Sequence, residues 1–408
     1  MNRMRKAGVF ALAMLTLLLT AGCWDSSEVN DLALELAWGI DSAKDKGVMI
    51  SAQVIAPFRI GSAQKSSGGG GGGQDKPYFV VTGTGKDTLD AVQQMQTKLS
   101  RQVYRAHRRV IVIGEAQARK GLKEVLDTYS RDPNLKLRSD IFIVRGGTAE
   151  EFLNVAYPLE DIPGMGALKE YSQIGTLKEM GLINLMISSI SDGNCPALPA
   201  IAIGFDTPGQ ESAQQGGSSG EKGFHIAGTG IFDNDLKLLG FIDVNEGKVL
   251  RWIKGELGKL IVTSQIAGDN GKISMDLNKL NSKVQPIFEG DNIKIQVTLI
   301  GQGMIRENNT GFDLTQPHNL NLVQEALEKQ VETNAYQTIT KVQDKFGTDV
   351  FEFGEVIHRK YPSRWRSLKD NWNQEFRKAE ISVKAKLTIR KIGVTGPSLH
   401  LKEREIKK

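Results

Sequence analysis

Hydrophobic residues in the first half of the chain occur as short apolar runs separated by stretches with helical spacing. Residues 32–40 and 48–56 are two runs of strand length around a polar turn, which predicts a hairpin. Residues 110–114 and 138–144 predict further strands, and residues 117–129 between them have the spacing of a helix. This alternation of strands and helices predicts an α/β region with a mixed sheet.

Two polar residues mark the positions where helices of this region begin. Asp87 precedes a helical pattern of apolar residues, so we expect its side chain to cap that helix. Thr148 followed by Glu151 has the spacing of a capping box. The stretch 83–88 looks like part of a phosphate-binding loop, but Val80 stands where its first glycine would be and Asp87 replaces its metal-binding hydroxyl. We therefore exclude nucleotide binding there.

The second half of the chain contains several strand patterns in succession. Residues 225–232 and 237–242 flank an Asp-Asn-Asp turn and predict a hairpin. Apolar runs at 259–265, 272–277 and 292–306 predict three more strands. Strands that follow one another directly usually pair antiparallel, so we predict an antiparallel sheet.

A long helix and a final strand complete the predicted C-terminal α+β domain. After Pro317, apolar residues from Leu322 to Phe346 recur every three or four positions, which predicts one long helix with an apolar face. Residues 380–391 alternate between apolar and polar side chains, which is the pattern of a half-buried strand. A Trp-rich helix is predicted between these two elements.

Stretches rich in glycine and serine divide the chain. Residues 62–76 contain six consecutive glycines, and we interpret them as a surface loop. Residues 206–222 interrupt the hydrophobic pattern over a full loop, so we place a domain boundary there. The predicted organisation is a signal peptide at 1–22, an N-terminal α/β region of one or two subdomains at 23–205, a linker at 206–222, a C-terminal α+β domain at 223–393 and a charged tail at 394–408.

The N-terminus has the composition of a secretory signal. Three basic residues precede an apolar run at 9–19, which is shorter than the ~20 residues of a transmembrane helix. The small residues Ala21 and Gly22 precede Cys23, whose thiol is the group that lipoprotein processing modifies with diacylglyceryl. We predict lipidation of Cys23, although Thr20 stands where this pattern usually has Leu. An ordinary signal peptide that contains a cysteine is the alternative.

The composition of the mature chain limits its function. Removal of residues 1–22 from 408 leaves 386 residues, enough for sizeable cores. Lys plus Arg then falls from 52 to 49 against 47 acidic residues, so the net charge falls to +2 and nucleic-acid binding is not indicated. Cys195 is the one cysteine left beside Cys23, so a lipidated chain forms no internal disulfide. We expect Cys195 to be a buried free thiol.

The sequence contains no recognisable catalytic or metal-binding motif. The five histidines lack metal-ligand spacing, and no Gly-x-Ser-x-Gly motif is present. His107 lies among Arg105, Arg108 and Arg109, which we interpret as a surface cluster rather than the setting of a catalytic base. We therefore predict no catalytic residue, no metal and no cofactor, and we expect a binding or assembly function instead of an enzyme.

The predicted Trp-rich helix offers two faces with different chemistry. Its apolar face carries Trp365, Leu368, Trp372 and Phe376. Basic residues occupy its other face: Arg364, Arg366, Lys369, Arg377 and Lys378. The tryptophans are expected in the core, since Trp is highly buried on average. As a second hypothesis, Arg364, Arg366, Trp365 and Trp372 are candidate residues for binding an acidic partner surface or anionic lipid.

Several stretches of the mature chain occur in an order and spacing that are specific in combination. They are Gly22-Cys23-Trp24-Asp25 with Glu28, Asn30, Asp31 and Leu32, then 107–115, 120–122, 131–133, 228–232, and finally Pro362, Trp365, Trp372 and Phe376. In this combination the chain resembles the C-subunit lipoproteins of nutrient germinant receptors in endospore-forming bacteria. Gly68 to Gly73 are not part of the resemblance, and we interpret them as a loop insertion.

The resemblance implies a non-enzymatic subunit that supports receptor assembly and relays the nutrient signal that starts spore germination. It implies a diacylglyceryl anchor at Cys23 on the outer, extracytoplasmic face of the spore inner membrane. The implied partners are a multi-spanning A-type subunit and a transporter-like B-type subunit. Anchoring would raise the effective concentration of the soluble domains near these partners.

Two other functional classes remain as alternatives. A solute-binding lipoprotein would deliver a small molecule to a transporter, but such proteins usually have two similar α/β lobes. The second half of this chain has strands in succession and a long helix instead, which disfavours that class. An extracellular hydrolase is the third alternative.

Overall fold

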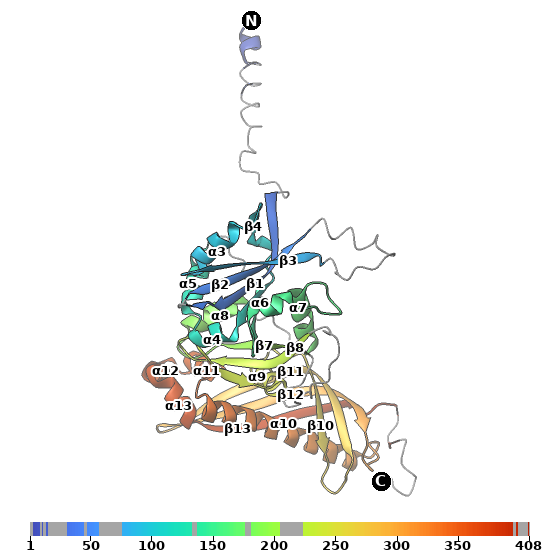
Figure 1. The fold of residues 1–408 in the computed structure, drawn as a ribbon. Helices are drawn as coiled ribbons and strands as arrows, with labels where there is room; N and C mark the ends of the chain where they lie inside the picture. Colours follow the sequence, from blue (N-terminus) through green and yellow to red (C-terminus); the bar gives the residue numbers. More distant parts are fainter. Residues whose placement is uncertain are drawn as a thin grey trace, which may run out of the picture.

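The computed structural model describes residues 31–394 apart from 45–46, 57–75, 133–136, 176–180 and 205–222, and it also describes residues 3–8, 10, 14, 397, 398 and 407. Within these residues the chain forms two β-sheets with helices packed against them, one sheet after the other along the molecule (Figure 1). The predicted lipidation site at Cys23 and the predicted linker at 206–222 lie outside the described residues, as does the loop at 62–76 except for Lys76.

The first sheet is mixed, as predicted. β1 (Leu32–Ser42) pairs antiparallel with β2 (Val48–Ile55), which confirms the predicted hairpin, and β2 pairs antiparallel with β3 (Tyr78–Gly85). On its other side β1 pairs parallel with β5 (Val110–Gly114), and β5 pairs parallel with β6 (Asp140–Val144). Because β5 and β6 are buried on both faces, their sequences are continuously apolar and do not alternate.

This sheet continues on both sides of residues 205–222. β7 (Ala197–Ile203) pairs parallel with β6 and antiparallel with β8 (Phe224–Phe232), and β8 pairs with β9 (Leu238–Ile242). β8 and β9 form the predicted hairpin, but they are strands of the first sheet, although we assigned their residues to the C-terminal domain. The domain division itself stays a prediction.

Short helices pack against the first sheet, and two of them begin at the predicted caps. The Asp87 side chain accepts a hydrogen bond from the Asp90 N–H, and Thr148 and Glu151 form the capping box. The helices are α3 (Thr88–Gln96), α4 (Glu115–Lys120), α5 (Lys123–Ser130), α6 (Ala149–Asn154), α7 (Pro163–Gln173), α8 (Leu182–Ile190) and α9 (Val244–Ile253).

The prediction of one helix over residues 117–129 is wrong. Gly121 has a φ of 120°, a conformation that favours glycine, and it separates α4 from α5. The next residue, Leu122, donates its N–H to the carbonyl of Leu236. This long-range bond takes the chain out of the helix, and no local pattern of apolar residues predicts it.

The second sheet has the strand order β10 (Lys259–Gln265), β11 (Lys272–Glu289), β12 (Asn292–Asn308) and β13 (Glu380–Lys391). β10, β11 and β12 are antiparallel neighbours, as predicted. β13 pairs parallel with β12, so the antiparallel pairing predicted for the sheet does not extend to its last strand. The helices between β12 and β13 return the chain to the end where β12 begins, as a parallel connection requires.

The predicted long helix is α10 (Pro317–Lys345), which packs against both edge strands of the second sheet. Its buried face includes Val323, Leu327 and Ile339. The half-buried Glu328 and Glu332 accept hydrogen bonds from the backbone N–H groups of Leu387 and Ala385, respectively, on β13. These carboxylates therefore occupy donors on the edge of the sheet.

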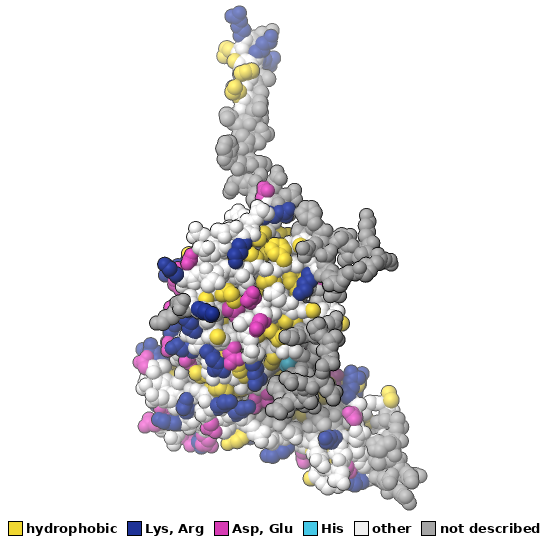
Figure 2. All heavy atoms as spheres, viewed as in Figure 1, with side chains coloured by type: hydrophobic (Ala, Val, Ile, Leu, Met, Phe, Trp, Pro, Cys, Tyr) yellow, Lys and Arg dark blue, Asp and Glu magenta, His cyan; other side chains and the backbone are white. Residues whose placement is uncertain are grey.

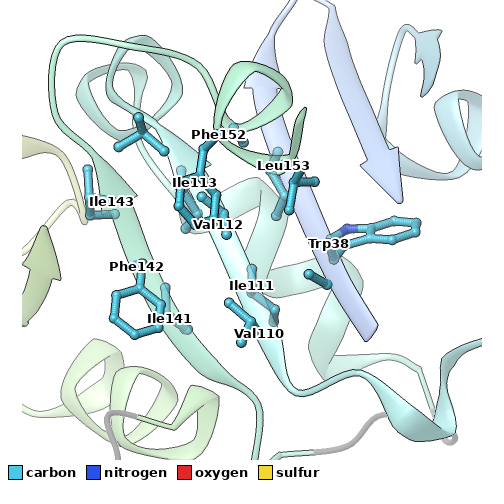
Figure 3. Packing of buried hydrophobic residues seen from close by; sticks show 14 of the residues in the cluster. Trp38, Val110, Ile111, Val112, Ile113, Ile141, Phe142, Ile143, Phe152 and Leu153 are labelled. Carbon is cyan, nitrogen blue, oxygen red and sulfur yellow. The ribbon is translucent and has the colours of Figure 1, made fainter. Parts of the chain in front are cut away.

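One hydrophobic core lies against each sheet. In the first core, Phe152 and Leu153 of α6 lie against Val112 and Ile113 of β5, near Trp38 of β1 (Figure 3). The second core joins the face of the second sheet to α10 and to the C-terminal aromatic residues. No helix in the described part of the chain has both the length and the apolar character needed to cross a bilayer.

Candidate functional site

The predicted Trp-rich helix is a chain of short helical segments. These are α11 (Phe353–Lys360), α12 (Pro362–Leu368), a 3-10 turn η4 (Lys369–Asn371) and α13 (Trp372–Lys378). Pro362 lies in the first turn of α12, where a missing N–H costs nothing. The 3-10 turn η4 separates α12 from α13, and the tryptophans of both helices lie in the core.

Trp365 and Trp372 are each 2% exposed, so both indoles are core side chains. Their rings meet edge to face with centroids 5.5 Å apart, and His358 stacks on Trp365. Phe376 is fully buried beside Trp372. The expectation that the tryptophans pack in the core is confirmed, and a partner can reach them only through neighbouring surface residues.

The buried carboxylate of Asp349 holds this aromatic cluster together. Its Oδ2 accepts hydrogen bonds from the Gly354 N–H at 2.8 Å and from the Trp372 Nε1–H at 3.0 Å, and its Oδ1 accepts one from the Phe351 N–H. Burial raises the pKa of Asp349 to about 6, although the hydrogen bonds to the carboxylate act in the opposite direction.

The same cluster joins the two halves of the molecule. The Cys195 N–H, just before β7, donates to the backbone carbonyl of Asp349 at 2.7 Å. A Cβ on Gly193 would lie 2.8 Å from the carbonyl carbon of Gly354, so these two backbones touch. Cys195 is 2% exposed and free, as expected, and burial raises the pKa of its thiol. The thiolate needed for reaction is therefore disfavoured.

Arg364 and Arg366, which precede and follow the buried Trp365 in the sequence, are both exposed. The guanidinium of Arg364 lies over the Phe288 ring, 5.5 Å from its centroid. Arg366 forms no ion pair with any residue that the structure describes. Figure 2 shows Lys and Arg side chains interspersed with Asp and Glu over this part of the molecule. The structure thus places the four candidate residues in one segment, with the arginines outside and the tryptophans inside.

A polar groove of ≈ 330 Å³ lies beside this segment, between α8 and the start of α11. Lys254 extends along it and pairs with Glu352 at 3.0 Å and with Glu256 at 3.8 Å. These charges satisfy one another and do not indicate a particular ligand. Among the described residues, no group of three or more His, Cys, Asp or Glu side chains is arranged to hold a metal ion.

Sequence analysis missed a buried ion pair in the first half of the molecule. Arg108 is 5% exposed, and its Nε and Nη2 donate to the two carboxylate oxygens of the fully buried Glu35, at 2.5 and 3.0 Å. The guanidinium also lies 4.2 Å from the Trp38 ring centroid. The interpretation of Arg105, Arg108 and Arg109 as a surface cluster is therefore wrong for Arg108. The sequence feature that could have indicated this ion pair is Glu35, the one carboxylate in the apolar run 32–40.

Comparisons with known proteins match nearly the whole chain to spore germination proteins. The family "Spore germination protein N-terminal domain" matches residues 25–203, and the family "Spore germination B3/ GerAC like, C-terminal" matches residues 227–393. Spore germination protein KC of Bacillus subtilis is 26% identical over 397 residues, covering 96% of this chain and 97% of the relative. Spore germination protein B3 of the same organism is 25% identical over 96% of this chain and 100% of the relative.

A solved structure shows the same fold. The chain described as "Crystal Structure of the GerBC protein" superposes with a TM-score of 0.52 over 90% of this chain and 100% of that chain, at 20% sequence identity. This likeness supports the mixed α/β arrangement followed by a second sheet with helices. These findings favour a germination protein over the solute-binding alternative.

Proposed function

We propose that this chain, a member of the GerAC-type C subunits of spore germinant receptors, is a non-enzymatic, lipid-anchored subunit needed for receptor assembly and for relay of the nutrient signal. The observation that carries the proposal is the match to germination proteins over both halves and almost the full length of the chain.

The proposed anchor is a diacylglyceryl group on Cys23, on the extracytoplasmic face of the spore inner membrane. It is supported by the basic residues, the short apolar run and the small residues before Cys23. At ~0.8 kcal/mol per buried methylene, one acyl chain binds a membrane only marginally, whereas two hold a protein stably. The signal peptide and membrane localisation belong to the same proposal.

The proposed partners are a multi-spanning A-type subunit and a transporter-like B-type subunit. Arg364 and Arg366 are the side chains that we propose for contact with an acidic surface of a partner, since both are exposed. Trp365 and Trp372 would act indirectly by fixing the segment that carries the arginines, because both indoles are buried. Anchoring keeps these groups near membrane partners at high effective concentration.

The anchor is tested by the Cys23→Ala substitution in spores. We expect the protein to leave the inner-membrane fraction and germination in response to nutrients to be impaired, because the substitution removes both acyl chains. Fractionation with immunoblotting and the loss of optical density during germination measure the two effects. Cys195→Ala is the matched control, since it removes the other cysteine and keeps Cys23.

The two parts of the proposal have separate outcomes. Cys23→Ala protein that stays in the membrane fraction would refute the lipid anchor. Cys23→Ala protein that leaves the membrane while germination and crosslinked recovery of the other subunits stay normal would refute the assembly and relay function. The Cys195→Ala control should behave as the parent in both measurements.

A further inference from the structure

A second basic surface lies in the first half of the molecule, far along the chain from Arg364. Residues 91–114 contain five Lys and Arg residues and no Asp or Glu. One of the five, Arg108, is buried against Glu35. We name the other four the anchor-proximal basic surface: Lys98, Arg101, Arg105 and Arg109.

Strand pairing places this surface beside the first residues of the described body. β4 (Gln102–Tyr104) pairs parallel with the beginning of β1, with Gln102 opposite Leu32 and Tyr104 opposite Leu34. Lys98 and Arg101 come just before β4. Figure 1 shows β4 and α3 at the end of the molecule where β1 begins, and α12 and α13 toward the second sheet.

Two charges of this surface, those of Lys98 and Arg109, are available to a ligand. Lys98 and Arg109 are exposed, and neither forms an ion pair with a residue that the structure describes. The Lys98 ammonium contacts an uncharged group, the carbonyl of Thr82. Arg105 pairs with Asp132, yet its side chain remains 40% exposed. Nearby carboxylates therefore neutralise only part of the positive charge.

Chain length sets how far this surface can lie from a lipid at Cys23. Nine residue steps separate Cys23 from Leu32, and a fully extended chain spans at most ~3.6 Å per residue, so Leu32 stays within about 30 Å of the anchor. Gln102 neighbours Leu32 in the sheet, so the near end of the basic surface lies close to this limit. Arg109 donates its N–H to the carbonyl of Leu36, four residues and therefore about 13 Å further along β1. Arg364 and Arg366 have no such constraint.

We propose that the anchor-proximal basic surface docks on anionic lipid headgroups and orients the molecule on its membrane. This rests on the lipid anchor of the proposed function and adds a second, electrostatic contact to it. Each Lys or Arg near an anionic bilayer strengthens binding by about five-fold, and the effect fades beyond one Debye length. Among possible ligands we choose a bilayer, because the proposed anchor holds one within reach of this surface.

The test measures vesicle binding without the acyl chains. Mature chain (residues 23–408) carrying Cys23→Ala is mixed at low salt with vesicles rich in phosphatidylglycerol and with neutral phosphatidylcholine vesicles, and bound protein is sedimented. We expect binding to the anionic vesicles only, lost as salt increases. Adding Lys98→Gln and Arg109→Gln should weaken binding on the order of 25-fold, from about five-fold per charge.

A matched control removes the same charge elsewhere. Lys384→Gln and Lys386→Gln, two exposed lysines of β13 in the second sheet, should leave anionic vesicle binding unchanged. Equal weakening by both double variants, or no weakening by the first, would overturn the proposal. Absence of binding to the anionic vesicles at low salt would also overturn it.

Orientation is measured in the acylated protein. A fluorophore on Ser100→Cys, beside the basic surface, should be quenched by a headgroup-located quencher, whereas one on Ser367→Cys in α12 should not. Equal quenching at both positions would refute the orientation. Failure of acylation would refute the anchor but leave the vesicle result standing, so the two proposals fail separately.

Discussion

Asp349 and Arg108 are both charged side chains in the interior, and each depends on groups that lie elsewhere in the sequence. Arg108 pairs with Glu35, 73 residues earlier, and Asp349 accepts a hydrogen bond from Trp372, 23 residues later. Both are at most 5% exposed. A buried charge costs several kcal/mol unless it is paired and hydrogen bonded, so each partner is needed. Local pattern shows neither partner, which is why sequence analysis misplaced Arg108.

We predict that Asp349→Asn reduces the pH dependence of stability. Because burial raises the pKa of Asp349 to about 6, the folded chain holds this proton more tightly than the unfolded chain, whose Asp has a pKa of about 4. The free energy of unfolding should therefore fall as the pH rises from about 4 to about 6, with this group contributing roughly 2 to 3 kcal/mol. Asn does not ionise, so that fall should disappear.

Denaturant unfolding at pH 4 and pH 7 measures the effect. Asp349→Asn should also lower stability by about 1–3 kcal/mol, since an amide cannot accept all three hydrogen bonds of the carboxylate. Asp127→Asn is the control, because Asp127 is exposed and, among the residues that the structure describes, forms an ion pair with Arg131 alone. If the free energy of unfolding of Asp349→Asn fell between pH 4 and pH 7 as much as that of the parent, Asp349 would not be the source of this pH dependence.

Elements whose causes are local could be predicted from the sequence, and elements fixed by distant contacts could not. The caps at Asp87 and Thr148, the long helix and the alternating strand β13 follow from neighbouring residues. β11 was predicted only to Leu277, but it continues past an irregularity between Asn278 and Asn281, because β12 pairs with its whole length. The parallel pairing of β13 likewise depends on β12, from which five helical segments separate it in the sequence.

We predict that the double variant Glu328→Ala and Glu332→Ala destabilises the second sheet and promotes self-association. These carboxylates occupy backbone donors of Leu387 and Ala385 at the sheet edge, and unpaired edge donors are a template for strand addition. We expect a loss of about 1–3 kcal/mol in the free energy of unfolding. Thermal unfolding and light scattering measure the two effects.

Glu325→Ala on the exposed side of the same helix is the control for helix propensity and charge. It should unfold like the parent and remain monodisperse. A double variant that is as stable and as monodisperse as the parent would show that the edge of β13 does not need these carboxylates.

At the scale of the whole molecule, the order of elements was predictable and the assembly of sheets was not. The boundary that we predicted at 206–222 rests on the composition of that stretch. One family match ends at residue 203 and the other begins at residue 227. The first sheet nevertheless includes β8 and β9, because Ala197 to Ile203 pair with Phe224 to Ile231 across it. The Trp-rich candidate segment was recognised from its spacing, whereas its contact with Cys195 and Gly193 required the fold.

The pairing of β7 with β8 means that cutting the chain between residues 204 and 223 need not separate the pieces. We expect residues 23–204 and 223–408, produced together, to reconstitute one two-piece protein, because seven residue pairs and the Asp349 contact still join them. Produced singly, each piece would leave an unpaired strand and should aggregate. Co-purification through a tag on one piece tests this. If each piece were soluble and folded when produced alone, the pairing of β7 with β8 would not be needed for the stability of either piece.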